Sequence, residues 1–344
     1  MLNNLMYLFF LFLFTSFFSC EEKEEVNRII EDNFISPIVN EIKTEDVLYV
    51  DRIECHDSLC IVINRKMSPC IHLYNRFDLI YQKAFGNSGH GPTDFLFPFF
   101  LYSSLNANNL LLYDVNLAAF KDVNLKKVLA NETDAFTMKP MPQDLLGSPN
   151  MFILSDSTFV GNKDNGDGLF FIKRKDGQLE WVEFPSSLVL PETDFTVMNM
   201  NRIAINEVKS KVAVGMSFYN KVFLYDFNKN RLKSVQIGED KVAPVVMDNY
   251  YLSGDNYLFC KEIKSTDNKI YLLMQRIKEE DISNPGNSTS TILVLDWNLD
   301  YVSTYQLSHY IMAFTVDTLT NRIIYAAMNE EGGSDLFYFN IADC

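Results

Sequence analysis

Apolar and polar residues alternate along the chain in short runs. Stretches of roughly four to eight residues rich in Val, Ile, Leu, Phe and Tyr are separated by Asn, Asp, Gly and Lys. Runs of this length are typical of β-strands, and the polar residues between them favour tight turns. The chain beyond its first thirty-three residues shows almost no helical spacing of apolar positions. The pattern therefore predicts an all-β domain.

One hairpin pattern recurs six times. An apolar strand ends in a polar residue, a short polar turn follows, and a second apolar strand leaves the turn. The polar residues are Asn75, Asp122, Arg174, Asp226, Asp296 and Asn340. They are separated by 47, 52, 52, 70 and 44 residues, and four-stranded propeller blades repeat every 40–50 residues or so. The spacing predicts a six-bladed β-propeller over residues 34–344.

The final copy of the hairpin lacks its second strand, whereas residues 34–42 form a spare strand at the beginning of the domain. We expect this N-terminal strand to complete the last blade, because ring closure leaves no open sheet edge. The 70-residue interval predicts an insertion. Residues 279–290, which are rich in Asn, Ser, Pro and Gly, are expected to form it as an exposed loop.

The N-terminus has the pattern of a secretion signal. Leu5 to Phe14 is a continuous apolar run, which is too short to span a bilayer and has the length of a signal-peptide core. Cys20 follows the small residue Ser19 at the end of the apolar stretch, as at the lipidation site of a bacterial lipoprotein. The pattern predicts a signal peptide at 1–19 and a lipid-anchored tether at 20–33. An uncleaved anchor and a plain secretory signal remain alternatives.

Net charge and cysteine count limit the classes of partner and the possible disulfides. The net charge is −15, so the chain would repel nucleic acid, whose binding depends on Lys and Arg contacts to phosphate. Of the six cysteines, five remain besides Cys20, so at least one has no partner within the chain. Cys55 and Cys60 flank a short turn and are candidates for a disulfide across a hairpin.

The segment from Ala84 to Pro98 contains a Gly-rich turn followed by an acidic and an aromatic residue, Gly89-His90-Gly91-Pro92-Thr93-Asp94-Phe95. Pro98 follows three residues later. This order resembles the turn between blades of NHL-repeat and TolB-like propellers, and in particular the six-bladed propeller lipoproteins of Bacteroidetes-type bacteria. The acidic run Glu21 to Glu25 resembles their surface-export signal, although a solvated tether fits it equally. The resemblance implies the fold and a location in the cell envelope, attached to the outer membrane on its periplasmic or outer side. It implies no catalytic residue.

Binding residues are expected in loops, because a rigid scaffold presents them there. His90, Asp94, Phe95 and His309 lie in connections between blades, on the face that should also carry the 279–290 loop. No metal-ligand spacing, nucleophile motif or cofactor motif stands out. The sequence therefore predicts a binding or scaffold module, without a cofactor, for a protein, peptide or glycan of the envelope. The alternative is a metal-dependent hydrolase, lactonase or lyase with its site in the propeller channel.

Overall fold

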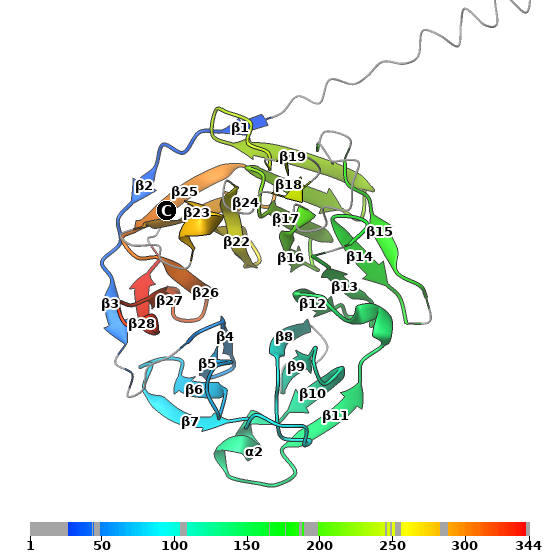
Figure 1. The fold of residues 1–344 in the computed structure, drawn as a ribbon, viewed down its shortest axis with the longest axis vertical. Helices are drawn as coiled ribbons and strands as arrows, with labels where there is room; N and C mark the ends of the chain where they lie inside the picture. Colours follow the sequence, from blue (N-terminus) through cyan, green and yellow to red (C-terminus); the bar gives the residue numbers. More distant parts are fainter. Residues whose placement is uncertain are drawn as a thin grey trace, which may run out of the picture.

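The computed structural model describes residues 27–42, 44, 49–103, 109–164, 166–175, 177–185, 188, 199–244, 246–247, 250–251, 256–282 and 288–341. Figure 1 shows the strands arranged in a ring of blades around a central axis. The prediction of an all-β, six-bladed propeller is confirmed. No helix in the described residues is long and apolar enough to cross a membrane.

The first three blades follow one another along the chain, each with four strands in antiparallel order. Blade 1 contains β4 (Arg52–His56), β5 (Leu59–Ile63), β6 (Ile71–Asn75) and β7 (Tyr81–Phe85). Blade 2 contains β8 (Pro98–Ser103), β9 (Leu110–Asp114), β10 (Ala119–Val123) and β11 (Phe136–Pro140). Blade 3 contains β12 (Asn150–Ile153), β13 (Phe159–Asn162), β14 (Phe170–Lys173) and β15 (Glu180–Val182). The innermost strands β8 and β12 also pair in parallel, which joins blades 2 and 3 into one sheet.

The last three blades also receive strands from the N-terminal segment. Blade 4 contains β16 (Asn201–Asn206), β17 (Lys211–Met216), β18 (Lys221–Asp226) and β19 (Arg231–Ile237). Blade 5 contains β22 (Tyr257–Ser265), β23 (Lys269–Lys278), β24 (Ser290–Asp296) and β25 (Tyr301–Leu307). Blade 6 contains β26 (Ile311–Asp317), β27 (Arg322–Met328), β28 (Ser334–Asn340) and β3 (Asn40–Ile42). In blade 6, β3 occupies the fourth position and pairs antiparallel with β28, with Ile42 opposite Leu336.

The N-terminal segment differs from the single strand expected at 34–42. Three short strands run along the outside of three consecutive blades (Figure 1). β1 (Asn27–Ile29) pairs in parallel with β19, and β2 (Phe34–Ile35) pairs in parallel with β25. Pro37, which has no backbone N–H to donate to a ladder, lies between β2 and β3. The expected tether at 20–33 therefore overlaps a segment that is already part of the sheets from residue 27.

Local side-chain hydrogen bonds explain why the recurring polar residues mark turns. The Oδ1 atom of Asn75 accepts from the Phe77 backbone N–H at 2.8 Å, and that of Asp296 accepts from Asn298 N–H at 2.7 Å. Asp226 does the same with Asn228 N–H at 3.0 Å. An Asn or Asp side chain stabilises a turn in this way by satisfying the second N–H that follows it.

Blade 2 departs from the expected hairpin. Asp122 lies within β10, and helix α2 (Leu125–Leu129) follows that strand where the second strand of the hairpin was expected. The Asn124 side chain accepts a hydrogen bond from Lys127 N–H and so caps this helix. Asn is favoured both in turns and at helix N-caps, so the sequence pattern does not predict this helix.

The 70-residue interval between Asp226 and Asp296 has two origins, the expected loop and a second connection. The expected loop at 279–290 begins with a short 3-10 helix, η4 (Glu279–Asp281), and its residues 283–287 lie outside the described part. The connection from β19 to β22 additionally contains the hairpin of β20 (Val246–Met247) and β21 (Tyr250–Tyr251). The interval of 70 residues is therefore divided between two connections.

Candidate functional site

The first strand of each blade lies closest to the central axis (Figure 1). Residues of these strands line a cavity in the channel. We call the two ends of the channel the strand-start face and the strand-end face, after the ends of these innermost strands. The strand-start face carries the connections between blades. The strand-end face carries the turns from the first to the second strand of each blade.

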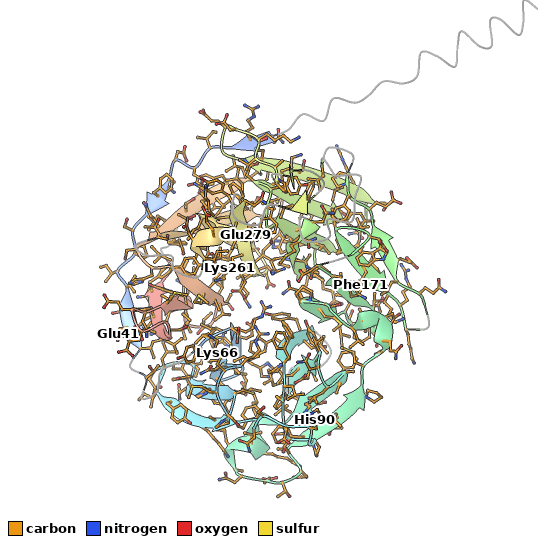
Figure 2. All side chains as sticks on the ribbon, viewed as in Figure 1. Glu41, Lys66, His90, Phe171, Lys261 and Glu279 are labelled. Carbon is orange, nitrogen blue, oxygen red and sulfur yellow. The ribbon has the colours of Figure 1, made fainter. Side chains whose placement is uncertain are left out.

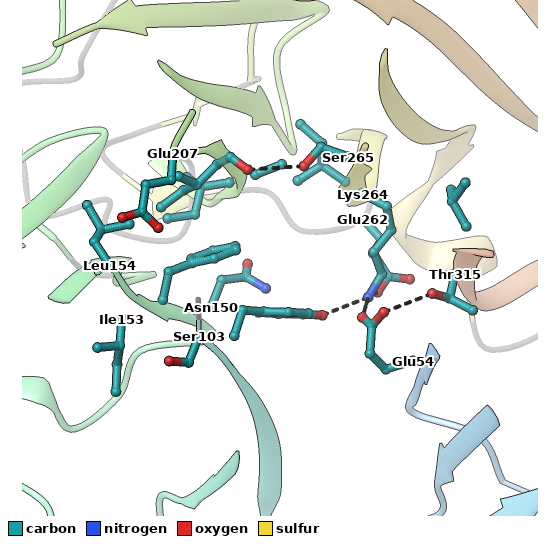
Figure 3. A pocket seen from close by; sticks show the side chains of 17 residues that line it. Glu54, Ser103, Asn150, Ile153, Leu154, Glu207, Glu262, Lys264, Ser265 and Thr315 are labelled. Carbon is teal, nitrogen blue, oxygen red and sulfur yellow. Dashed lines mark hydrogen bonds and ion pairs between the residues drawn. The ribbon is translucent and has the colours of Figure 1, made fainter. Parts of the chain in front are cut away.

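A cavity of about 340 Å³ occupies the channel towards the strand-end face. We call it the channel pocket (Figure 3). Its mouth contains Ser103, Glu207 and Ser265. Much of its wall is apolar, including Phe152 and Ile205. Its inner end is charged, so a ligand in the pocket would contact both apolar surface and charged groups.

Lys264 is the centre of the charged end. Its Nζ atom lies 3.0 Å from Glu54 Oε2 and 3.4 Å from Glu262 Oε1, and it donates a hydrogen bond of 2.8 Å to the Tyr102 hydroxyl. These residues come from β4, β8 and β22, which belong to three different blades. The ammonium group therefore joins blades 1, 2 and 5 at the axis, and we call Lys264, Glu54, Glu262 and Tyr102 the channel network.

The carboxylates of the channel network have further partners. Glu54 Oε1 accepts a hydrogen bond of 3.1 Å from Thr315 Oγ1 of blade 6, and Glu262 Oε2 accepts one of 3.0 Å from Phe314 N–H. The Arg52 guanidinium approaches Glu262 at 3.9 Å. Each carboxylate is thus held by more than one donor, which fixes its orientation.

Burial makes this pairing necessary. The Lys264 side chain is 8% exposed and that of Glu262 is 6% exposed. Burial by itself disfavours the charged ammonium, but Glu54, Tyr102 and Glu262 outweigh it and raise the pKa of Lys264 well above its ordinary value. Burial, and then the Glu54 carboxylate, raise the pKa of Tyr102. Lys264 therefore stays protonated and Tyr102 stays a neutral phenol at physiological pH.

Two polar atoms at the pocket lack a complete set of hydrogen-bond partners. Among the described residues, the Tyr102 hydroxyl accepts from Lys264 but has no acceptor for its own proton. Asn150 Oδ1, which belongs to a residue of the pocket wall, is buried and has no donor in the described part of the chain. The pocket therefore combines an apolar surface with a few polar groups, which is the usual composition of a small binding site. The described residues contain no group of three His, Cys, Asp or Glu arranged to hold a metal ion.

The model of the TolB-like 6-blade propeller-like family matches residues 38–319. The chain belongs to this family. No curated protein matches the sequence. Among solved structures, a member of the DUF4221 family from Bacteroides vulgatus is similar with a TM-score of 0.63 and 12% identity, over 92% of this chain and 98% of that one. A protein from Bacteroides fragilis that is described as exported is similar with a TM-score of 0.59 and 12% identity, over 92% of this chain and 100% of that one.

In this TolB-like propeller the Gly-rich turn has a structural role. Phe95 is 1% exposed and packs in the core between blades 1 and 2, so its ring has almost no surface for the expected binding contact. Asp94 Oδ2 accepts from Gly91 N–H at 2.9 Å, and a Cβ atom on Gly89 would lie only 2.4 Å from the same carboxylate oxygen. A side chain at Gly89 would therefore displace the Asp94 carboxylate, which fills the inside of the turn.

The two candidate histidines do not meet. His90 is exposed and lies towards the outer edge of the TolB-like propeller (Figure 2). His309 is half-buried in blade 6, where its ring stacks on Phe337 at 4.5 Å and Nδ1 lies 2.9 Å from the Tyr325 hydroxyl. Burial lowers the pKa of His309, with Asp335 opposing it. Both histidines nevertheless lie in connections between blades, on the strand-start face, and their role in binding stays a prediction.

The cysteine predictions have different outcomes. Cys55 and Cys60 face each other across the β4–β5 hairpin, as expected, and both are free thiols in the structure. A hydrogen bond to Cys60, together with burial, raises the pKa of the Cys55 thiol. Their disulfide stays a prediction. The lipidation site Cys20 lies outside the described residues.

Sequence reasoning missed the channel network. The signal was present in the innermost strands of the TolB-like propeller, where charged residues alternate with apolar ones, as in Arg52-Ile53-Glu54 and Glu262-Ile263-Lys264. In an innermost strand the apolar positions pack between sheets, as Ile53 and Ile263 do, while the alternate positions point into the channel. A charged residue in such a strand therefore indicates a group that lines the axis.

Proposed function

We propose that this chain is an exported, lipid-anchored binding module of the cell envelope, which holds part of a protein, peptide or glycan partner in its channel pocket. The observation that carries the proposal is the pocket itself. A cavity of about 340 Å³ ends at a charged network, and its lining includes the Tyr102 hydroxyl, which has a proton to donate. Groups fixed by a scaffold in this way lose little entropy on binding.

Export is supported by two observations. The N-terminal sequence has the order of an apolar run, a small residue and Cys20. The similar protein from Bacteroides fragilis is described as exported. A lipid on Cys20 would attach the propeller to the outer membrane a few residues before β1 begins at Asn27.

Closing the pocket tests the binding proposal. Ser103→Trp places a large side chain at the mouth of the channel pocket, whereas Val208→Trp adds the same side chain at an exposed position on the same face. Each purified protein is crosslinked to envelope extract and the captured partners are identified. We expect wild type and Val208→Trp to capture the same partner and Ser103→Trp to lose it. Equal capture by all three would contradict a role for the pocket.

The anchor has a separate test. Cys20→Ala should move the protein from the membrane fraction to the soluble fraction, because the lipid supplies most of the membrane affinity. Cys344→Ala is the matched control, since it removes another cysteine that lies outside the described residues. If Cys20→Ala still sediments with membranes, the lipid anchor is wrong, while the binding proposal is unaffected.

A further inference from the structure

A second cavity lies on the strand-start face, at the opposite end of the channel from the pocket. Its volume is about 380 Å³, and it lies between blades 6, 1 and 2. We call it the rim cavity. Its lining includes Tyr49, Asp51, Arg65, Lys66, Phe97 and Met312. It therefore combines cations, aromatic rings and methionine, a different composition from that of the channel pocket.

Two cations lining the rim cavity are stacked on its rings. The Arg65 guanidinium lies 3.7 Å from the centre of the Phe97 ring, and its Nη2 atom lies 2.6 Å from Asp51 Oδ1. The Lys66 ammonium lies 4.7 Å from the centre of the Tyr49 ring. Lys66 is exposed and has no ion-pair partner in the described part of the chain. Stacking on a ring orients a cation without neutralising it.

Two further cations adjoin the rim cavity. Lys261 Nζ lies 3.7 Å from Met312 Sδ and donates to Ile311 O at 3.2 Å. Arg52 lies 5.1 Å from the centre of the Phe99 ring, and Arg65 lies 5.4 Å from the same ring. Lys66 and Lys261 both lie near the centre of the ring of blades (Figure 2). We call Arg52, Arg65, Lys66 and Lys261 the rim cations.

The rim cations are incompletely neutralised. Asp51 pairs with Arg65, and Glu262 reaches Arg52 only at 3.9 Å while also holding Lys264. Lys261, like Lys66, has no ion-pair partner among the described residues. Burial, with Arg52 and Arg202 nearby, lowers the pKa of Lys261 to about 8, although Glu262 and Asp51 oppose the change. A bound anion would stabilise this cluster, in a chain whose net charge is −15.

The rings distinguish between acidic ligands. Sugars bind proteins largely by stacking on open aromatic faces. In the rim cavity, Arg65 covers one face of Phe97 and Lys66 covers one face of Tyr49. The Phe97 ring also contacts the Phe99 ring, with 5.1 Å between their centres. Met312 and Met328 line the same cavity, and flexible thioether side chains adapt to varied apolar groups. Carboxylates beside apolar side chains, as in an acidic peptide, match both features.

We propose that the rim cavity binds an acidic peptide segment of the partner, with carboxylates at the rim cations and apolar side chains against Met312 and Met328. This proposal rests on the proposed binding function and names the class of the partner. It also assigns the strand-start face a role that is separate from that of the channel pocket. Recognition of acidic segments by clustered cations is a common mode of peptide binding.

A display library of random peptides tests the proposal with the full mature chain as bait. We expect wild type to enrich peptides in which Asp or Glu lies next to apolar residues. Lys66→Glu should reduce the affinity for an enriched peptide by about tenfold or more, because it reverses an unneutralised charge. Lys233→Glu makes the same change at an exposed position on β19 and should have no effect. Lys66 is exposed, so its replacement leaves the core intact.

The outcomes separate this proposal from the one on which it rests. Two results would overturn the rim proposal and leave the proposal for the channel pocket in place. One is that the enriched peptides contain no acidic residues. The other is that acidic peptides bind Lys66→Glu and wild type with equal affinity. Binding of polygalacturonate, an acidic glycan, in a Lys66-dependent way with no enriched peptide would overturn the peptide class alone. No enrichment by wild type, together with no partner captured from envelope extract, would remove the binding function as well.

Discussion

Lys261 and Lys264 lie on the same innermost strand, three residues apart, yet their surroundings are opposite. Lys264 points into the channel network, where two carboxylates and a phenol surround it. Lys261 reaches the edge of the rim cavity, where its polar contacts are a backbone carbonyl and a thioether. Burial opposes both charges, but the pKa of Lys264 is raised and that of Lys261 is lowered to about 8.

The difference shows how the same residue type serves two purposes in one strand. A buried charge costs several kcal/mol unless partners of the protein replace its water. At Lys264 the protein supplies those partners, so the charge joins blades. At Lys261 it supplies only a carbonyl, a thioether and the Tyr310 ring, whose centre lies 4.8 Å from Nζ, so the buried charge reduces stability. On this view the channel network is structural support for the pocket, and the rim cations are a binding surface.

Removing the supported lysine should have the largest effect. Lys264→Met leaves Glu54 and Glu262 close together in the channel with only part of their neutralisation. Breaking a buried ion pair typically costs about 3–5 kcal/mol, so the free energy of unfolding should fall by about that amount. Urea unfolding followed by circular dichroism measures it. Lys233→Met, at an exposed position, is the control and should change stability little. A loss below about 1 kcal/mol for Lys264→Met would contradict the structural role.

The unsupported lysine should behave in the opposite way. Lys261→Met keeps a long flexible side chain and removes the charge, so the free energy of unfolding at pH 7 should rise by about 2 kcal/mol after allowance for partial exposure. The same urea titration measures this change. A destabilised variant would show that Lys261 is held by its neighbours after all, and the comparison between the two lysines would fail.

The pH dependence of the same pair sharpens that result. The pKa of Lys261 is about 8 in the folded chain, below its ordinary value of 10.5. The folded state therefore binds fewer protons between these values, and the stability of wild type rises with pH in this window relative to the variant. The advantage of Lys261→Met should be constant below pH 8 and shrink towards pH 10.5. An advantage that stays constant across the window would assign it to packing instead of charge.

The sequence predicted what depends on neighbouring residues. Asn75, Asp226 and Asp296 were identified as turn residues, and each forms its hydrogen bond within two residues. The spacing of such turns was enough for the blade count. The channel network could not be found in the same way, because Lys264 is 210 residues from Glu54 and 162 from Tyr102. These contacts exist only once the ring has brought three blades to one axis.

Two errors came from treating a local signal alone. The run at 34–42 has the composition of one strand, but its parts pair with blades 5 and 6 on either side of Pro37. The position of Phe95 in a connection between blades predicts an exposed side chain, yet the turn folds back and buries it. In both cases tertiary packing, which the linear pattern does not contain, decides the role of the residue.

The smallest expected effect concerns Thr315, whose hydroxyl joins blade 6 to the channel network. Thr315 is buried, and Oγ1 donates to Glu54 Oε1 at 3.1 Å. Thr315→Val removes this hydrogen bond and keeps the shape, while Glu54 retains Lys264 and the Cys55 backbone N–H. The free energy of unfolding should fall by about 1 kcal/mol, well below the loss in Lys264→Met. Binding of acidic peptides should not change, because the rim cations are untouched. An equal loss in free energy of unfolding for Thr315→Val and Lys264→Met would show that hydrogen bonds, and not chiefly the ion pair, hold the network. The contrast between Lys261 and Lys264 would then lose its electrostatic basis.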